Sequence, residues 1–274
     1  MNAYAPLRDS PVRSYSAKLA RFAQFAEPEL RGIVAGLRLP PRAVVLDLGC
    51  GVGLVSALLA EAIGGSGRVI GADLSLPHLQ AAKANYLGPL VQADAARMCF
   101  RPGAFDVIWS CNTLNHVDDP VGVLKSLKPL LRGSGRVVLA QSGFLPEMFF
   151  AWDAPLDEAV RRACHAYYRN RYSLEVADTA GLRGLVRLLD LAGYRRGAVR
   201  TVVIERLQPL GAADAAYFEE TMFAGTWGER LKPFLDAREW DALRRYTDPE
   251  SAEYCLHRRD FHHLQTLTVC EGHG

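Results

Sequence analysis

The sequence predicts an α/β protein in which a parallel sheet is wound with helices on both faces. Between residues 44 and 140, apolar strand-like runs alternate with helical segments, a pattern typical of parallel sheets. The first run leads into a glycine-rich turn, Gly49-Cys50-Gly51-Val52-Gly53, and three of the first four runs carry an aspartate at or near their carboxyl end. Ligands of such sheets bind beyond the carboxyl ends of the strands, so this edge is the predicted site.

Hydrophobic periodicity and turn residues place the elements in order. Helical spacing predicts helices at residues 14–26, 27–37, 54–63, 77–85, 121–131 and 181–192, whereas apolar or β-rich runs predict strands at 44–48, 68–73, 90–94, 105–110, 136–140, 198–207 and 264–270. Pro40 and Pro41 stop the second helix before the first strand. Glycine-rich turns at 64–67 and 133–135 close the third and fifth helices.

These elements divide the chain into six predicted segments. They are an N-terminal helical extension at 1–40, a ligand-binding core at 41–142, an aromatic and irregular insertion at 143–180, a core helix with the sixth strand at 181–207, a mainly helical cap at 208–260 and the last strand at 261–274. The extension could form a lid over the glycine turn, with Tyr15 as a contact, or could simply pack against the core.

Length and composition favour a globular protein with a sizeable core. The chain has 274 residues, 49% of them hydrophobic, and its net charge is +2. It therefore lacks the strongly basic character that is typical of nucleic-acid-binding proteins. Its six cysteines show neither a CxxC pair nor metal spacing, and no run reaches the ~18 apolar residues of a membrane helix. We therefore expect a cytoplasmic protein with reduced thiols and no metal, membrane or nucleic-acid partner, and we leave its oligomeric state open.

The glycine turn and the acids after it indicate a ligand that contains a nucleoside. A dinucleotide site would need a small residue after Gly53 in the GxGxxG pattern, but the chain has Leu54 there. Asp73, twenty residues beyond Gly53, can accept hydrogen bonds from two neighbouring ribose hydroxyls, as both nucleotide-binding families require. Asp94 adds an acceptor at the depth where an adenine amino group would lie.

Five motifs, taken in order, carry a family resemblance. They are Asp47-Leu48-Gly49-Cys50-Gly51-Val52-Gly53, Gly71-Ala72-Asp73-Leu74-Ser75, Gln92-Ala93-Asp94-Ala95, Phe105-Asp106-Val107-Ile108 and Leu114-Asn115-His116-Val117-Asp118-Asp119-Pro120. Over residues 43–142 the chain resembles the class I S-adenosylmethionine-dependent methyltransferases, in particular the branch that acts on small molecules such as natural products. The resemblance implies a Rossmann-like doubly wound sheet of seven strands, with the last strand antiparallel and inserted beside the fifth.

The resemblance also implies S-adenosylmethionine as the cofactor and S-adenosylhomocysteine as its product. The glycines would face the methionine and ribose parts, Asp73 the ribose hydroxyls, and Asp94 with Ala95 the adenine, while Asn112 and His116 would border the sulfonium and the acceptor. The candidate cofactor residues are Asp47, Gly49, Gly51, Gly53, Asp73, Leu74, Asp94, Ala95, Asn112 and Tyr15. Asp47 could reach the methionine amino group or could only satisfy backbone amides at the turn.

Methyl transfer from a sulfonium is a direct displacement, so the enzyme chiefly aligns donor and nucleophile and needs a base only when the nucleophile carries a proton. The candidate bases are His116, His257 and His262, because histidine can deprotonate a phenol or an amine. His262 and His263 are adjacent in a strand and should point to opposite faces, so we reject a metal pair there.

These residues predict a methyltransferase that acts on an oxygen or nitrogen, or on a carbon, of a hydrophobic small molecule such as a secondary metabolite. Aromatic residues in 144–172 and 217–240 could form an apolar cap over the acceptor, besides their ordinary role in a core. One alternative is a protein of the same fold that binds S-adenosylmethionine without methylating and steers another reaction or binds a partner. A second is an oxidoreductase that uses NAD.

Overall fold

The computed structural model describes residues 16–143, 148–172 and 184–274, so Tyr15 lies outside the described residues. The chain forms two compact units, each of which is made from separate stretches of sequence. The first unit contains residues 1–142, 181–202 and 268–274, and the second contains 143–180 and 203–267.

The first unit is built on a mixed sheet with the strand order β3-β2-β1-β4-β5-β8. The strands are β1 Val44–Leu48, β2 Arg68–Asp73, β3 Leu90–Gln92, β4 Phe105–Cys111, β5 Leu131–Ser142, β7 Arg195–Leu207 and β8 His262–His273, and β7 pairs with β8. Strands β1 to β5 pair in parallel. Strand β8 runs antiparallel to β5. Arg136 of β5 forms an ion pair with Glu271 of β8, and the later residue Gly143 donates its amide to the carbonyl of the earlier residue Thr266.

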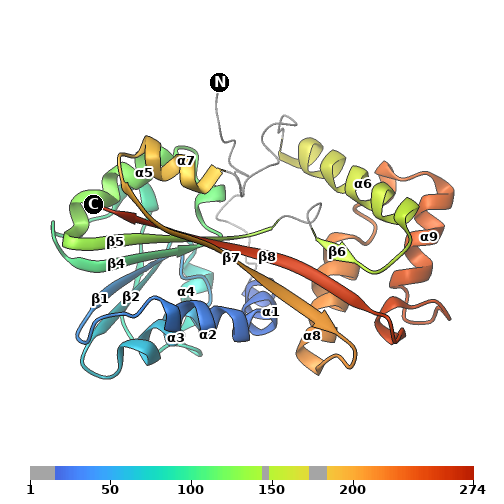
Figure 1. Ribbon diagram of the computed structural model, residues 1–274, viewed down its shortest axis with the longest axis horizontal. Coiled ribbons are helices and arrows are strands. Elements are labelled where there is room, and N and C mark those ends of the chain that lie inside the picture. Colours follow the sequence, from blue (N-terminus) through green and yellow to red (C-terminus); the bar gives the residue numbers. More distant parts are fainter. Residues whose placement is uncertain (1–15, 144–147, 173–183) are drawn as a thin grey trace. The chain divides into compact units, whose positions relative to one another are not determined.

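Helices cover both faces of this sheet, as the alternating sequence predicts. They are α1 Ser16–Phe25, α2 Glu27–Gly36, α3 Leu54–Ile63, α4 Leu76–Ala82, α5 Pro120–Leu127 and α7 Leu185–Leu191, with short 3-10 turns at Ala95–Arg97, Leu114–His116 and Lys128–Leu130. Helices α5 and α7 lie over one face, and α2 and α3 lie over the other (Figure 1). Leu46 of β1, Leu124 of α5 and Leu188 of α7 belong to one buried cluster on the first of these faces.

The structure confirms the Rossmann-like sheet with an antiparallel last strand, and it adds a two-residue strand, β6 Phe149–Phe150. The largest difference from the predicted boundaries lies between the fifth helix and the fifth strand. We expected the fifth helix to reach residue 131 and a turn at 133–135, but α5 ends at Leu127 and β5 already begins at Leu131. Leu131 pairs with Phe105, and the register then shifts before Arg136 pairs with Val107, so the glycine-rich stretch is an irregular part of the strand.

The second unit has an aromatic core under helices. It contains β6, α6 Ala154–Tyr172, α8 Ala212–Ala216, a π-helical segment Tyr217–Thr226 and α9 Ala237–Thr247, with 3-10 turns at Lys232–Phe234 and Cys255–His257. Phe150 is buried and its ring lies 4.7 Å from that of Trp227 and 4.5 Å from that of His263. We expected an irregular segment between residues 143 and 180, and this was wrong for the 19 residues of α6. Among the described residues, none of the helices is both long enough and apolar enough to span a bilayer.

Candidate functional site

The glycine turn between β1 and α3 has a backbone that side chains would disfavour. Gly49, Gly51 and Gly53 have φ angles of 74°, 53° and 77°, in the left-handed region that favours glycine. The amides of Gly49 and Cys50 donate to the Ala72 carbonyl of β2, at 2.7 and 3.0 Å. A Cβ on Gly49 would lie 2.1 Å from Thr113 Oγ1, so the space beside this glycine is already filled by the segment after β4.

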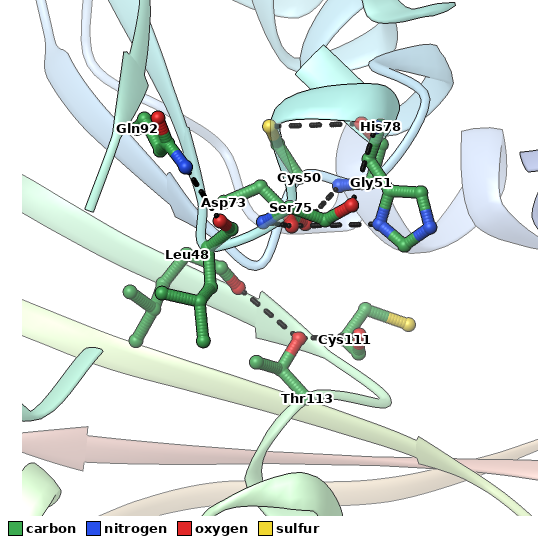
Figure 2. Close-up of polar contacts among 10 residues, drawn as sticks. Leu48, Cys50, Gly51, Asp73, Ser75, His78, Gln92, Cys111 and Thr113 are labelled. Carbon is green, nitrogen blue, oxygen red and sulfur yellow. Dashed lines mark hydrogen bonds and ion pairs between the residues drawn. The ribbon is translucent and has the colours of Figure 1, made fainter. Parts of the chain in front are cut away.

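That segment closes the turn from the opposite side. Thr113 Oγ1 donates to the Leu48 carbonyl at 3.3 Å and to the Cys111 carbonyl at 3.0 Å (Figure 2). The preceding residue, Asn112, has a φ of 53°, and its Oδ1 accepts hydrogen bonds from Ser142 N at 2.8 Å and Ser142 Oγ at 3.1 Å. The ends of β1, β4 and β5 are therefore joined at the edge where the sequence predicts the site.

Asp73, at the end of β2, holds the glycine turn through its carboxylate (Figure 2). Its Oδ2 accepts from Gly51 N at 2.9 Å, and its Oδ1 accepts from Ser75 N at 2.8 Å and lies 3.4 Å from His78 Nδ1. Burial alone would raise the pKa of Asp73, but the hydrogen bonds from His78, Ser75 and Gly51 outweigh it and lower that pKa. Asp73 is consequently an anionic acceptor at the predicted ribose position.

The pKa of Asp47 is shifted in the opposite direction to that of Asp73. Its side chain is buried and its Oδ2 accepts a hydrogen bond from Ser56 Oγ, in the first turns of α3, at 2.5 Å. Burial, with a smaller contribution from the charge of Asp73, raises the pKa of Asp47 to about 7. The structure thus shows that Asp47 connects β1 to α3 through a hydrogen bond.

Cys50, between the first two glycines, is also buried, and burial raises the pKa of its thiol, which disfavours a nucleophilic role.

The predicted adenine and ribose neighbours lie after β2 and β3. Asp94 caps a 3-10 turn, where its Oδ1 accepts from Ala96 N at 2.9 Å, and Ala95 packs partly buried against the core. Leu74 is 47% exposed, and its carbonyl accepts from Gln92 Nε2 at 3.1 Å. Asp94 therefore retains a second oxygen for which the described residues show no hydrogen bond.

The three candidate bases are divided between the two units, with one in the first and two in the second. His116 is exposed and lies in the 3-10 turn after β4, within the first unit. His257 and His262 belong to the second unit, where the His257 ring packs on Tyr254 and His262 Nε2 lies 2.9 Å from Glu205 Oε1. His262 is partly exposed whereas His263 is buried.

Sequence reasoning missed four side chains that shape this edge. They are Ser56 beneath Asp47, His78 beside Asp73, Thr113 against Gly49, and Asn115 after β4. Asn115 is 6% exposed, and its Oδ1 has no hydrogen-bond partner among the described residues. Of these, Asn115 lies inside a recognised motif and His78 follows another motif by three residues, so these two carried a usable signal.

Comparison with known proteins decides the family. The methyltransferase domain family matches residues 46–139. Over 189 residues the chain is 36% identical to a demethylmenaquinone methyltransferase of Lactococcus lactis, and the match covers 64% of this chain and 71% of that protein. The chain belongs to the class I S-adenosylmethionine-dependent methyltransferases. S-adenosylmethionine is accordingly the cofactor of this methyltransferase.

Other relatives of this methyltransferase match over shorter parts. An uncharacterized 37.1 kDa protein in transposon Tn4556 of Streptomyces fradiae is 33% identical over 60% of this chain and 46% of its own length. A ubiquinone biosynthesis O-methyltransferase of Xanthomonas campestris is 30% identical over 40% of this chain and 47% of its own length. The chain thus spans about half the length of these two relatives.

The same fold occurs in solved structures. A SAM-dependent methyltransferase from Aquifex aeolicus superposes with a TM-score of 0.51 at 20% identity, over 70% of this chain and 92% of that one.

The residues at the glycine turn fit the adenosyl part of the cofactor. A carboxylate offers about four lone-pair positions, and the three contacts on Asp73 leave acceptor capacity on Oδ2 for a hydroxyl. The free oxygen of Asp94 can accept from an amino group. Among the described residues, a Cβ on Gly51 would meet Leu19 of α1 alone, at 3.1 Å, so within this part of the chain the turn is less crowded here than at Gly49.

Replacing Gly49 by alanine should cost more than backbone strain alone. Gly103 is a matched control, because its φ of 64° is similar but no atom of the described residues lies within 4 Å of its Cβ position. We expect Gly103→Ala to lower the free energy of unfolding by about 1 kcal/mol, the usual price of left-handed alanine, and Gly49→Ala by at least about 2 kcal/mol, since Thr113 must move. Urea denaturation measures both, and equal losses would contradict the role of Thr113.

The buried carboxyl of Asp47 should make stability fall as the pH rises. Its pKa is raised from 3.8 to about 7 in the folded protein, so the stabilisation is complete below pH ~4 and is lost as the pH rises through ~7. Asp47→Asn stays neutral and keeps an acceptor for Ser56. The difference in unfolding free energy, variant minus wild type, should grow by about 2 kcal/mol between pH ~5 and pH ~8. Asp241→Asn, at an exposed position on α9, should show no such growth.

Proposed function

We propose that this methyltransferase transfers the S-adenosylmethionine methyl group to an oxygen, nitrogen or carbon atom of a hydrophobic small molecule of quinone or secondary-metabolite type. The observation that carries this proposal is the 36% identity to a demethylmenaquinone methyltransferase, of which the chain covers 71%. The ubiquinone biosynthesis O-methyltransferase at 30% identity supports the same acceptor class. Both relatives act, by their names, in the chemistry of quinones.

The cofactor would be held by the turn and the strand ends. In this proposal Asp73 accepts hydrogen bonds from the ribose hydroxyls, and Asp94 with Ala95 faces the adenine. The lowered pKa of Asp73 supports its part, because an anionic carboxylate is the stronger acceptor. The left-handed backbone at Gly49 and Gly51 would face the methionine part, with more room beside Gly51 than beside Gly49, and Leu74 and Asn112 would border the cofactor.

Catalysis would rest mainly on alignment. S-adenosylmethionine supplies an electrophilic methyl group, and displacement needs the acceptor atom in line with the breaking carbon–sulfur bond. The segment after β4 is suited to positioning, because Asn112 and Thr113 are tied to β5 and β1 by hydrogen bonds. His116 follows three residues later and is exposed, so it can reach a bound acceptor and remove a proton from its hydroxyl or amine.

His257 and His262 are weaker candidates for the base. The ring of His257 lies 4.9 Å from that of Tyr254, and His262 is engaged with Glu205 and packs against Phe149. These contacts are of the kind that keep a histidine in a structural role. Aromatic side chains of the second unit, such as Phe150 and Trp227, are likewise buried in its core.

The activity is tested by following labelled methyl from S-adenosylmethionine into a panel of reduced quinones and phenols. We expect labelled product with at least one member of the panel. Binding of S-adenosylhomocysteine without transfer to any quinol, phenol or amine would contradict the proposal and would favour a protein that binds the cofactor without methylating.

Replacing Asp73 by alanine should weaken cofactor binding. The variant loses the acceptor for the ribose hydroxyls and the anchor of the Gly51 amide, so the affinity for S-adenosylhomocysteine should fall by about 1–3 kcal/mol, measured by titration calorimetry. Asp241→Ala, at an exposed position in the second unit, is the control and should bind as wild type. Unchanged affinity in Asp73→Ala would remove Asp73 from the site.

Replacing His116 by alanine separates transfer from binding. If His116 is the base, turnover should fall about 10²- to 10⁴-fold while the affinity for S-adenosylhomocysteine stays the same. His165→Ala, on α6, serves as the control for loss of a histidine elsewhere. Full activity in His116→Ala would exclude His116 as the base. Alignment of the donor with the acceptor would then be the remaining source of catalysis.

A further inference from the structure

A histidine lies against the carboxylate that we place at the ribose. His78 belongs to α4, and its Nδ1 lies 3.4 Å from Asp73 Oδ1 (Figure 2). Both side chains are nearly buried, with 11% of His78 and 12% of Asp73 exposed. The backbone of His78 is fixed as well, because its amide donates to Ser75 Oγ at the start of α4. His78 therefore has a defined position beside Asp73.

The acceptor positions of Asp73 are nearly used up in this arrangement. Gly51 N takes one position on Oδ2 and Ser75 N takes one on Oδ1. Of about four lone-pair positions on a carboxylate, two remain, and His78 faces one of them. Two neighbouring ribose hydroxyls need two positions, so a donor on His78 Nδ1 competes with one hydroxyl.

The protonation state of the ring decides this competition. A neutral imidazole can carry its proton on Nε2 and leave Nδ1 without a donor, whereas the imidazolium has a donor on both nitrogens. The charged ring also forms an ion pair with Asp73, which holds the donor in place more strongly than a neutral hydrogen bond does.

We propose that His78 is a positioning residue for Asp73, and that its protonation occupies one of the two acceptor positions needed by the ribose, so that cofactor affinity falls on acidification. This inference rests on the proposed contact between Asp73 and the ribose. It gives the cofactor site a sensitivity to pH that is independent of the acceptor and of the methyl-transfer step.

Other charged or titratable groups lie on the elements that pack around the pair. Asp47 of β1 and Cys50 of the glycine turn both interact electrostatically with Asp73. Helix α1, which packs against α4, carries Lys18 and Arg21, and Lys83 follows α4 itself. Of these, Asp47 changes its charge near neutral pH, because burial raises its pKa to about 7. The effect of His78 must therefore be measured as a difference between variants.

The test compares wild type with His78→Leu and His78→Asn. Neither leucine nor asparagine titrates, so both variants keep the contribution of Asp47 and lose that of His78. Calorimetry with S-adenosylhomocysteine should give similar affinities for wild type and His78→Leu at pH ~8, and an affinity about 3- to 10-fold higher for His78→Leu at pH ~5.5, which corresponds to one hydrogen bond. His165→Leu, on α6, should follow the wild type at both pH values.

Two outcomes would overturn the proposal. One is a ratio of His78→Leu to wild-type affinity that is the same at both pH values, and the other is a His78→Asn variant with the wild-type pH profile. His78→Asn also keeps the test valid if leucine impairs folding. Cofactor analogues that lack the 2′- or the 3′-hydroxyl need only one acceptor, and at least one should bind wild type without the dependence on His78.

Failure of the proposed ribose contact can be distinguished from failure of the proposed role of His78 by comparison with Asp73→Ala. If Asp73→Ala binds S-adenosylhomocysteine as wild type does, the ribose placement itself fails. If Asp73→Ala binds weakly while the His78 variants match wild type at every pH, the placement holds and the role of His78 is wrong.

Discussion

The site depends on a left-handed backbone at the end of β1 that has no room for a side chain. At Gly49 the φ angle and the contact with Thr113 both require glycine, because a Cβ would lie 2.1 Å from the threonine hydroxyl. The turn is also fixed from β2, since the Ala72 carbonyl accepts two of its amides and Asp73 accepts a third. The parallel register of β1 with its two neighbours thus sets the shape of the turn.

Two aspartates at this edge have pKa values that move in opposite directions, and their surroundings explain the division. Asp47 is buried with a hydroxyl as its partner, and its pKa rises. Asp73 receives two backbone amides and faces a histidine, and its pKa falls. Two anions at short range repel each other, so the charge is concentrated on the residue that has donors. That residue, Asp73, is also the less buried of the two.

The sequence predicted the core of the fold because strands and helices there differ in period and are separated by glycines and prolines. It also indicated Asp73, which ends β2, and Asp94, which lies just after β3. It did not indicate Thr113, because its contact with Gly49 joins segments 64 residues apart and leaves no local pattern. Helix α6 was missed for another reason. Leu156, Ala159, Val160, Ala163 and Cys164 are buried at helical spacing, but three of them are small, and the sequence interpretation relied on the aromatic residues around them.

The second unit consists of two separate stretches, 143–180 and 203–267, whereas both ends of the chain belong to the first unit. In sequence, the boundaries between the units fall within β7 and within β8. A chimera that exchanges this unit with a relative must therefore transplant both stretches together and splice them within β7 and β8, where the backbone geometry of the recipient is already fixed. The glycine turn and Asp73 lie outside the exchanged stretches, so such chimeras would keep the recipient's residues that we propose for the cofactor while the second unit alone is replaced.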